Sequence, residues 1–198
     1  MRVAAAATEA KGTAKSTVKV VPHHLAVDAS VTGTGKVSLR EPRADLTFDI
    51  SDVLGIAGVM TGTDLPVQVA GQTVYADPPD IPTVGIPEGW LKADVPALAG
   101  ALDPGTQLRQ LAATGGFKEA GSEKIDGVDV RRYHSKEADI WVDAQHLVRR
   151  IRTIVALPAG AGTLDVTTDL DEYGTPFDTR PPAHATDVTS TVQGLLKG

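Results

Sequence analysis

Gly33, Gly35 and Lys36 stand at a spacing that invites comparison with the phosphate-binding loop of nucleotide-binding proteins. That motif needs a glycine where this chain has Ser30, and a serine or threonine where it has Val37. Both positions therefore lack the residue that phosphate binding requires. The two glycines instead favour a hairpin turn between two strands, which is the structure that we predict for this segment.

The histidines of the chain are not spaced as metal ligands usually are. A pair on one helix, four residues apart, would turn both rings toward one metal ion, and no such pair is present. His23 and His24 are direct neighbours, so a strand would turn them to opposite faces. We therefore predict no metal site. The histidines are His23, His24, His134, His146 and His184.

Acidic residues gather near residues 165–172, where a pair of carboxylates could supply the chemistry of glycoside hydrolysis. Alternation along a strand puts Asp165, Asp169 and Asp171 on its solvent face, where a solubilising role is the simplest explanation. The sequence has no Gly-x-Ser-x-Gly elbow, and no histidine is placed to activate a serine. We therefore predict that the protein is not an enzyme and has neither catalytic residues nor a cofactor.

The charge balance argues against nucleic acid as a partner. The net charge is −6, whereas binding to a phosphate backbone depends on clustered Lys and Arg side chains. The densest basic stretch, Arg149, Arg150 and Arg152, is explained as well by a solvated sheet face. The chain contains no cysteine, which excludes disulfides, thiolate metal sites and cysteine nucleophiles.

Most of the chain shows the alternation of apolar and polar residues that is typical of half-buried strands, most clearly over residues 44–51 and 163–171. The alanine-rich residues 2–15 predict an N-terminal helix that is weakened at Gly12. Short turns join the alternating segments, so we predict one contiguous antiparallel meander. The predicted strands cover residues 18–29, 32–39, 44–51, 66–70, 73–77, 117–125, 128–134, 138–142, 147–155 and 163–171.

One interruption has the spacing of helices. Leucines recur every three or four residues between Asp94 and Thr114, with Asp94 and Asp103 as N-caps, and this pattern predicts two short helices. The tail from Arg180 is rich in Pro, Thr and Ser, and predicts a poorly ordered end. We therefore expect one domain over residues 1–188 and a flexible C-terminal tail over residues 189–198.

Residues 53–60 are apolar but rich in glycine, which disfavours both a long strand and a long helix. Two interpretations stay open. The segment forms a buried loop or a short capping helix, or it forms a mobile apolar lip at the mouth of a cavity, where its glycines allow opening.

The order of these pieces resembles the actinobacterial LppX and LprG-like lipoproteins, which belong to the wider LolA-like lipoprotein-carrier fold. The resemblance covers the chain from about Ala4 to Val188. It implies an α+β fold in which a strongly curved antiparallel β-sheet, a half-barrel, has helices packed on its concave face. The motifs that carry it are residues 89–94 (Gly-x-x-Lys-x-Asp around Trp90), 121–128, 140–150 and 173–176, followed by Pro181 and Pro182.

The resemblance also implies a function, which is to bind acylated lipid or lipoprotein acyl chains in an apolar cavity as a non-catalytic carrier or chaperone. We expect lipid or acyl chains as the partner, no nucleic acid, and a monomer. The alternative is an envelope sensor or protein-interaction domain of the same fold with no transported lipid. The expected cavity residues are Leu46, Phe48, Ile50, Leu54, Ile56, Val59, Met60, Leu98, Leu102, Leu108 and Leu111, and the expected rim residues are Trp90, Lys92 and Arg149.

Members of this family are exported and are anchored to the outer face of the cell membrane by an acylated cysteine. The present sequence has no cysteine, and its N-terminal apolar run is too short for a signal peptide. We therefore expect an exported, lipid-anchored protein whose signal and acylated cysteine have been removed from this chain.

Overall fold

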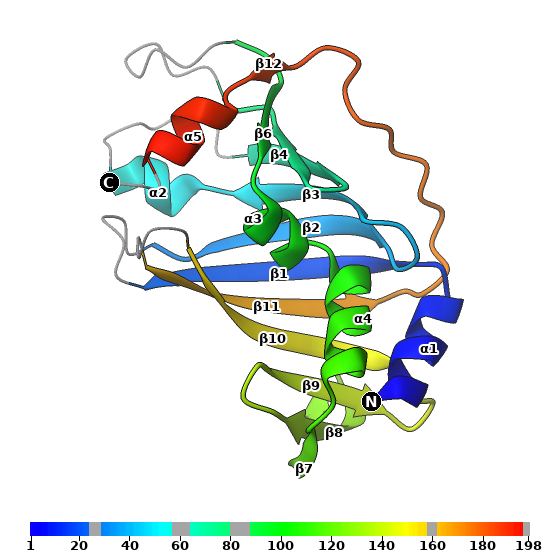
Figure 1. Cartoon of the computed structure of the whole chain (residues 1–198). Coiled ribbons are helices and arrows are strands. Elements are labelled where there is room, and N and C mark those ends of the chain that lie inside the picture. Colours follow the sequence, from blue (N-terminus) through cyan, green and yellow to red (C-terminus); the bar gives the residue numbers. More distant parts are fainter. Residues whose placement is uncertain (24–28, 57–63, 80–87, 158–161, 196–198) are drawn as a thin grey trace.

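The computed structural model of the chain describes residues 1–23, 29–56, 64–79, 88–157 and 162–195 (Figure 1). Its helices are α1 (Arg2–Ala10), α2 (Ser51–Ile56), α3 (Pro96–Ala101), α4 (Pro104–Thr114) and α5 (Thr189–Leu195). Its strands are β1 (Thr13–His23), β2 (Val31–Ser38), β3 (Arg43–Asp49), β4 (Asp64–Ala70), β5 (Thr73–Ala76), β6 (Leu91–Asp94), β7 (Lys118–Ile125), β8 (Val128–His134), β9 (Ala138–Asp143), β10 (Val148–Ala156), β11 (Thr163–Asp171) and β12 (Thr186–Asp187).

All strands belong to one 12-stranded sheet in the order β12-β6-β5-β4-β3-β2-β1-β11-β10-β9-β8-β7. Every neighbouring pair is antiparallel except β12 and β6, which run parallel over two residues. The predicted contiguous antiparallel sheet is therefore confirmed, with one short parallel addition at its edge.

The sheet is strongly curved. The short helix α3 contacts both β5 and β10, although β4, β3, β2, β1 and β11 lie between these two strands in the sheet order. Gly33 and Gly35 on β2 permit the close packing behind α3, because a Cβ on Gly33 would lie 2.7 Å from the Phe48 ring and one on Gly35 2.0 Å from the Asp45 carbonyl oxygen. Helices α1, α3 and α4 lie on the concave face, so the predicted fold class is confirmed (Figure 1).

The two faces of the central strands differ as the alternation predicted. On β11, Leu164, Val166, Thr168 and Leu170 are buried on the concave face. On the convex face the arginines of β10 are paired rather than free: Arg150 with Asp169, Arg152 with Asp165, and Arg149 with Asp143. Asp165 thus lies on the face that alternation predicted, but its pairing with Arg152 leaves it only 9% exposed, so the predicted solvent exposure is wrong.

The N-terminal helix is shorter than the sequence predicted. It ends at Ala10, and Gly12 then takes a left-handed conformation with φ of 81°. This turn lets β1 begin at Thr13, five residues before the predicted start at Val18. The alternation of Ala14, Ser16 and Val18 on the buried face accounts for the extra strand length.

Both predicted helices between Asp94 and Thr114 are present, but only one predicted cap is correct. Asp103 caps α4, since its Oδ1 accepts a hydrogen bond of 3.2 Å from the Thr106 backbone N–H. The N-cap of α3 is Val95, because Asp94 belongs to β6 and accepts a hydrogen bond from the Thr73 hydroxyl instead. Gly115 ends α4 as predicted, with φ of 71°.

The C-terminal tail contains regular elements that the sequence did not predict. After β11 the chain passes the ends of β1 to β3 and reaches the far edge of the sheet, where β12 pairs with β6 and α5 follows (Figure 1). The Thr179 hydroxyl donates to the Asp45 carboxylate at 2.7 Å, and Thr186 N–H donates to the Trp90 carbonyl at 2.8 Å. Among the helices that the structure describes, none is both long and apolar enough to cross a membrane.

Candidate functional site

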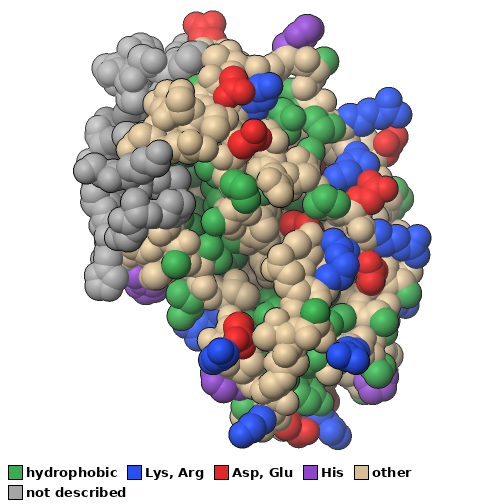
Figure 2. All heavy atoms as spheres, viewed as in Figure 1, with side chains coloured by type: hydrophobic (Ala, Val, Ile, Leu, Met, Phe, Trp, Pro, Cys, Tyr) green, Lys and Arg blue, Asp and Glu red, His purple; other side chains and the backbone are tan. Residues whose placement is uncertain are grey.

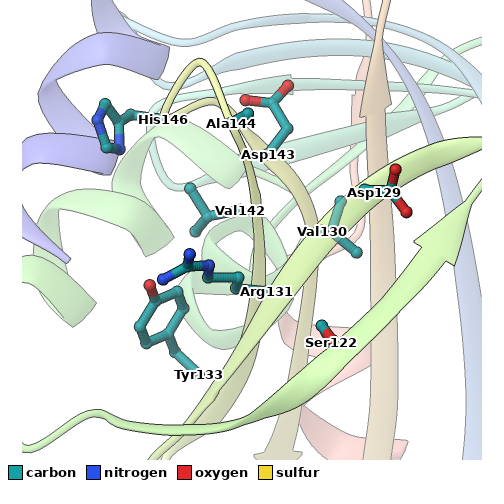
Figure 3. Close-up of a pocket in the computed structure, with 9 residues that line it drawn as sticks. All are labelled: Ser122, Asp129, Val130, Arg131, Tyr133, Val142, Asp143, Ala144 and His146. Carbon is teal, nitrogen blue, oxygen red and sulfur yellow. The ribbon is translucent and has the colours of Figure 1, made fainter.

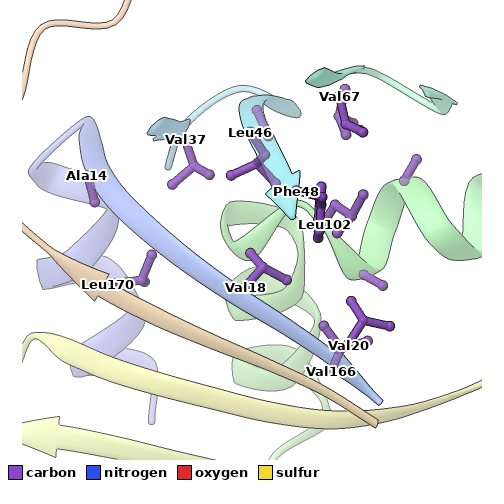
Figure 4. Close-up of a cluster of buried hydrophobic side chains, with 14 of the residues drawn as sticks. Ala14, Val18, Val20, Val37, Leu46, Phe48, Val67, Leu102, Val166 and Leu170 are labelled. Carbon is purple, nitrogen blue, oxygen red and sulfur yellow. The ribbon is translucent and has the colours of Figure 1, made fainter. Parts of the chain in front are cut away.

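Two clusters of buried apolar side chains lie between the sheet and its helices. The first, which we call the α3 core, joins the concave faces of β1 to β4 and β11 to helix α3 (Figure 4). Val18 and Val37 are completely buried in it, and Leu102 at the end of α3 packs against the same cluster. Its buried members are Ala14, Val18, Val20, Val37, Leu39, Ala44, Leu46, Phe48, Val67, Val69, Ala99, Ala101, Leu102, Leu164, Val166 and Leu170.

The border of the α3 core at one end of the half-barrel is aliphatic. Several aliphatic side chains that pack against it are only partly buried, and they come from the ends of strands that meet at the same side of the sheet, together with Leu98 of α3. Figure 2 shows the molecule from the side on which α3 and α4 lie, with apolar side chains exposed among polar ones near the middle of the view. We call this set the mouth; its members are Val31, Ile50, Leu65, Ala76, Leu98, Val155 and Leu157.

The second cluster, the α4 core, has a different border: the partly buried apolar residues packed against it are Met1, Ala112, Phe117 and Tyr133. It packs α1 and α4 onto β9 and β10, and Ile140, Val148 and Ile151 have no exposed surface. Thr8 of α1 is also fully buried, and its hydroxyl oxygen accepts a hydrogen bond of 2.9 Å from the Val148 N–H where β10 bulges. The buried members are Ala4, Ala5, Leu108, Leu111, Ala138, Ile140, Val142, Val148 and Ile151.

The expected cavity residues are therefore divided between the two cores. Leu46, Phe48 and Leu102 lie in the α3 core, and Ile50 and Leu98 lie at its mouth. The sequence also predicted that Leu108 and Leu111 face these residues, and that part is wrong, because both leucines pack in the α4 core. Helix α2 covers Ser51–Ile56, so the start of the glycine-rich segment is a short helix. The side chains of Leu54 and Ile56, and the whole of Val59 and Met60, lie outside the described residues.

The expected rim residues do not form one rim. Trp90 and Lys92 lie at β6, and Lys92 is 3.9 Å from the Asp187 carboxylate of β12. Arg149 lies on β10, with six strands between it and β6 in the sheet order, where its guanidinium pairs with Asp143 at 2.7 Å. The sequence of a strand does not show where a bulge will form. It therefore does not show which face an arginine beside the bulge will occupy or which residue it will pair with.

Most of the mouth residues were not among the residues predicted from the sequence. Val31, Leu65 and Val155 are in phase with the buried positions of β2, β4 and β10, so alternation alone places them on the concave face. Nothing in their residue types distinguishes a buried core position from a partly exposed one at the end of a strand. The feature of the sequence that could have indicated their partial exposure is their position next to predicted loops.

A separate hollow of about 570 Å³ lies at the far end of the sheet, on β7 to β9 (Figure 3). Its lining mixes charged, hydroxyl and apolar side chains, and sequence analysis did not identify it. Ser122 and His146 lie at opposite sides of the hollow in the close-up, so they are not arranged as a nucleophile and its base. The lining residues are Ser122, Asp129, Val130, Arg131, Tyr133, Val142, Asp143, Ala144 and His146.

The junction of α3 and α4 contains a buried carboxyl group. Asp103 is 1% exposed; burial raises the pKa of its carboxyl, while the Thr106 hydrogen bond and the nearby Arg109 oppose that shift. The Gln107 side-chain amide donates to the Ala101 carbonyl, which ties the end of α3 to α4. Within the described ranges, no three His, Asp or Glu side chains are grouped so that they could hold a metal ion.

Comparison with solved structures identifies the fold. The lipoprotein LppX from Mycobacterium tuberculosis aligns with a TM-score of 0.54 and 15% identity, over 90% of this chain and 95% of that one. A DUF1329 family protein from Desulfovibrio piger (9% identity, 89% of this chain and 93% of its own) and an outer membrane lipoprotein-sorting protein domain from Vibrio parahaemolyticus (11%, 98% and 95%) give TM-scores of 0.29 and 0.24, too low to carry an argument.

A scan against models of protein families gave no match, and a search of the curated proteins gave none either. The likeness to LppX covers most of both chains and shows the fold alone at this level of identity. The expectation that the resemblance raised about architecture is confirmed: the chain has the fold of the LppX-like lipoproteins.

Proposed function

We propose that this chain is a non-catalytic cell-envelope protein that binds acyl chains at the mouth and carries or shields them. The observation that supports the proposal is the mouth itself: aliphatic side chains from β2, β4, β5 and β10, together with Leu98 of α3, pack against the α3 core and stay partly exposed. A contiguous apolar patch at the end of a core commonly marks a ligand or partner site.

The energetics of such a site need little polar recognition. Removing apolar surface from water stabilises a complex by about 25 cal/mol per Å², so a long acyl chain that covers the mouth gains several kcal/mol before the costs of association. The six-residue helix α3 is a small cover for a sheet that curves from β5 to β10. Displacing α3 would extend the apolar surface from the mouth into the α3 core.

The same proposal places the protein at the outer face of the cell membrane and gives it no reaction to catalyse. LppX is a lipoprotein by name, and the shared fold favours an envelope role for this chain. The hollow on β7 to β9 brings no serine beside a base, which also favours a binding function.

The test is native mass spectrometry of the protein purified from a lipid-containing host, with a search for co-purifying acylated molecules. Leu98→Trp fills the mouth and should remove the adduct. Ile154→Trp is the matched control, because Ile154 is 67% exposed on the neighbouring strand position of β10, outside the mouth. The absence of any adduct, together with no binding of added fatty acid, would reject the carrier and favour a sensor or protein-interaction domain.

A further inference from the structure

Two hydroxyl groups are buried in the concave face without a hydrogen-bond partner. Ser16 of β1 is 3% exposed and Thr168 of β11 is 1% exposed. Within the described residues, neither Ser16 Oγ nor Thr168 Oγ1 has a donor or acceptor in reach. A buried hydroxyl without a partner destabilises the folded chain, whereas alanine or valine at these positions would avoid that loss.

The two hydroxyls belong to one place on the sheet. Ser16 lies opposite Leu170, and Thr168 lies opposite Val18, so the two residues are diagonal neighbours on adjacent strands. Such neighbours are about 7 to 8 Å apart between their α-carbons, and one oxygen bonded at about 2.8 Å to each hydroxyl can span them. Gly35, opposite Ser16 on β2, has no side chain that could supply a partner.

Their position relates them to the mouth. On one side Thr168 pairs with Val18 of the α3 core, and on the other with Ile151 of the α4 core, so the hydroxyls mark the boundary between the two cores. Thr163 begins β11 at the mouth, and five residues of strand put Thr168 about 17 Å from that end. A long acyl chain that entered along β11 beneath α3 would reach this depth.

Two other buried polar atoms without partners do not belong to this place. Gln68 lies on β4 between the concave positions Val67 and Val69, and therefore on the opposite face. Asp103 Oδ2 belongs to the cap of α4. The pair on β1 and β11 is thus a polar spot on the otherwise aliphatic floor of the α3 core.

We propose that Ser16 and Thr168 form a polar subsite for an oxygen atom carried part-way along the acyl chain, as a hydroxyl or an ester carbonyl. The inference rests on the proposed function, and it narrows the ligand class to oxygenated or esterified acyl chains. A serine or threonine hydroxyl both donates and accepts, so the pair suits either kind of oxygen. A plain methylene at the same depth leaves both hydroxyls unpaired, which favours the oxygenated chain.

The experiment compares two probes of equal length, stearic acid and a stearic acid with a mid-chain hydroxyl, by displacement of a fluorescent fatty acid from the purified chain. The parent should bind the hydroxylated probe about tenfold more tightly, as two neutral hydrogen bonds allow. The double variant Ser16→Ala, Thr168→Val should bind both probes equally, with its affinity for stearic acid unchanged or higher.

Two control variants distinguish an effect on ligand binding at the subsite from an effect on folding. Thr17→Ala with Thr167→Val removes two hydroxyls from the same strands on the convex face, and should keep the preference. Thr168→Ser keeps the hydroxyl and should also keep the preference for the hydroxylated probe. Equal binding of both probes by the parent, or a preference that survives in the double variant, would overturn the subsite while leaving the carrier function intact. A parent that binds neither probe would overturn the proposed function and this inference together.

Discussion

The α3 core and the α4 core lie side by side under one sheet, yet they end differently. The α4 core is covered by α1 and α4, and its strand residues Ile140 and Ile151 have no exposed surface. The α3 core continues into aliphatic side chains that remain partly exposed at the mouth. One continuous sheet thus carries two cores whose borders differ in composition: aliphatic side chains at the mouth for the α3 core, and Met1, Ala112, Phe117 and Tyr133 for the α4 core.

The helices that cover the two cores differ in number and length. Helix α4 has 11 residues and contacts α1, so two helices share the task of covering the neighbouring strands. Helix α3 has six residues and, in the part of the chain that the structure describes, is the helix that contacts both β5 and β10. A short helix makes few tertiary contacts, and elements with few contacts open at low free-energy cost. The α3 side is therefore the half in which we expect movement.

The largest effect should come from opening a cavity in the α4 core. Ile140→Ala should lower the free energy of unfolding by about 2 to 5 kcal/mol, because the side chain is fully buried and its neighbours cannot collapse into the space. Leu98→Ala at the mouth should cost much less, since Leu98 is already partly exposed. Urea unfolding of both variants measures the difference. Equal losses would show that the two cores are equally closed.

Larger side chains should also destabilise the α4 core more than the mouth. Leu108→Trp places an indole in the α4 core and should cost about 1 to 3 kcal/mol, whereas Leu98→Trp should leave stability almost unchanged. Thermal unfolding checks this, with a shift of about 2 to 4 °C per kcal/mol for a chain of this size. A Leu98→Trp variant that unfolds as early as Leu108→Trp would mean that the mouth is filled by the fold itself.

The attachment of α1 offers a smaller test. Thr8→Val keeps the shape of the side chain but leaves the buried Val148 N–H without an acceptor, which should cost about 1 to 2 kcal/mol. Thr8→Ser keeps the hydroxyl and should cost less. Amide hydrogen exchange at Val148 provides the site-specific measurement. Unchanged protection in Thr8→Val would show that α1 does not stabilise the bulge of β10.

Sequence analysis predicted the architecture well because it depends on alternation and turns. Residues 163–171 alternate as clearly in the structure as in the sequence, and the two helices between Asp94 and Thr114 are present. The strand β6 was missed because its four residues lie directly before a helical pattern and are held by partners far along the chain. The helix α5 was missed because its Thr- and Ser-rich sequence has low helix propensity.

The candidate site could be predicted only in part, for a related reason. The break between the helices at Asp103 could be predicted, but the spacing of Leu98 and Leu102, or of Leu108 and Leu111, does not show that the two pairs enter different cores. The partners of Arg149 depend on a bulge in β10, a tertiary feature. Ser16 lies before the predicted start of its strand at Val18, and only the register shows that it is a neighbour of Thr168.

The smallest effect concerns Asp103, which stands at the turn between the helices of the two cores. Burial is the main reason that its pKa is raised, so the folded protein binds this proton more tightly than the unfolded chain does. Stability from this group is therefore fully present below the ordinary pKa of 3.8 and is lost as pH rises through the higher folded value. At neutral pH the buried carboxylate opposes folding.

Asp103→Asn keeps an acceptor for the Thr106 N–H and removes the charge, so this variant should be modestly more stable than the parent at neutral pH. Its advantage should shrink as the pH falls from the raised folded pKa toward 3.8 and should be lost below 3.8, because the parent carboxyl is then neutral as well. Asp103→Ala removes the cap and should instead be less stable by about 1 kcal/mol. Urea unfolding of all three proteins across this pH range gives the comparison, in which the other carboxylates cancel. If Asp103→Asn instead loses stability at neutral pH, the negative charge of Asp103 must stabilise the turn between α3 and α4. The turn at the boundary between the two cores would then be held by electrostatic attraction, and the buried carboxylate would favour folding.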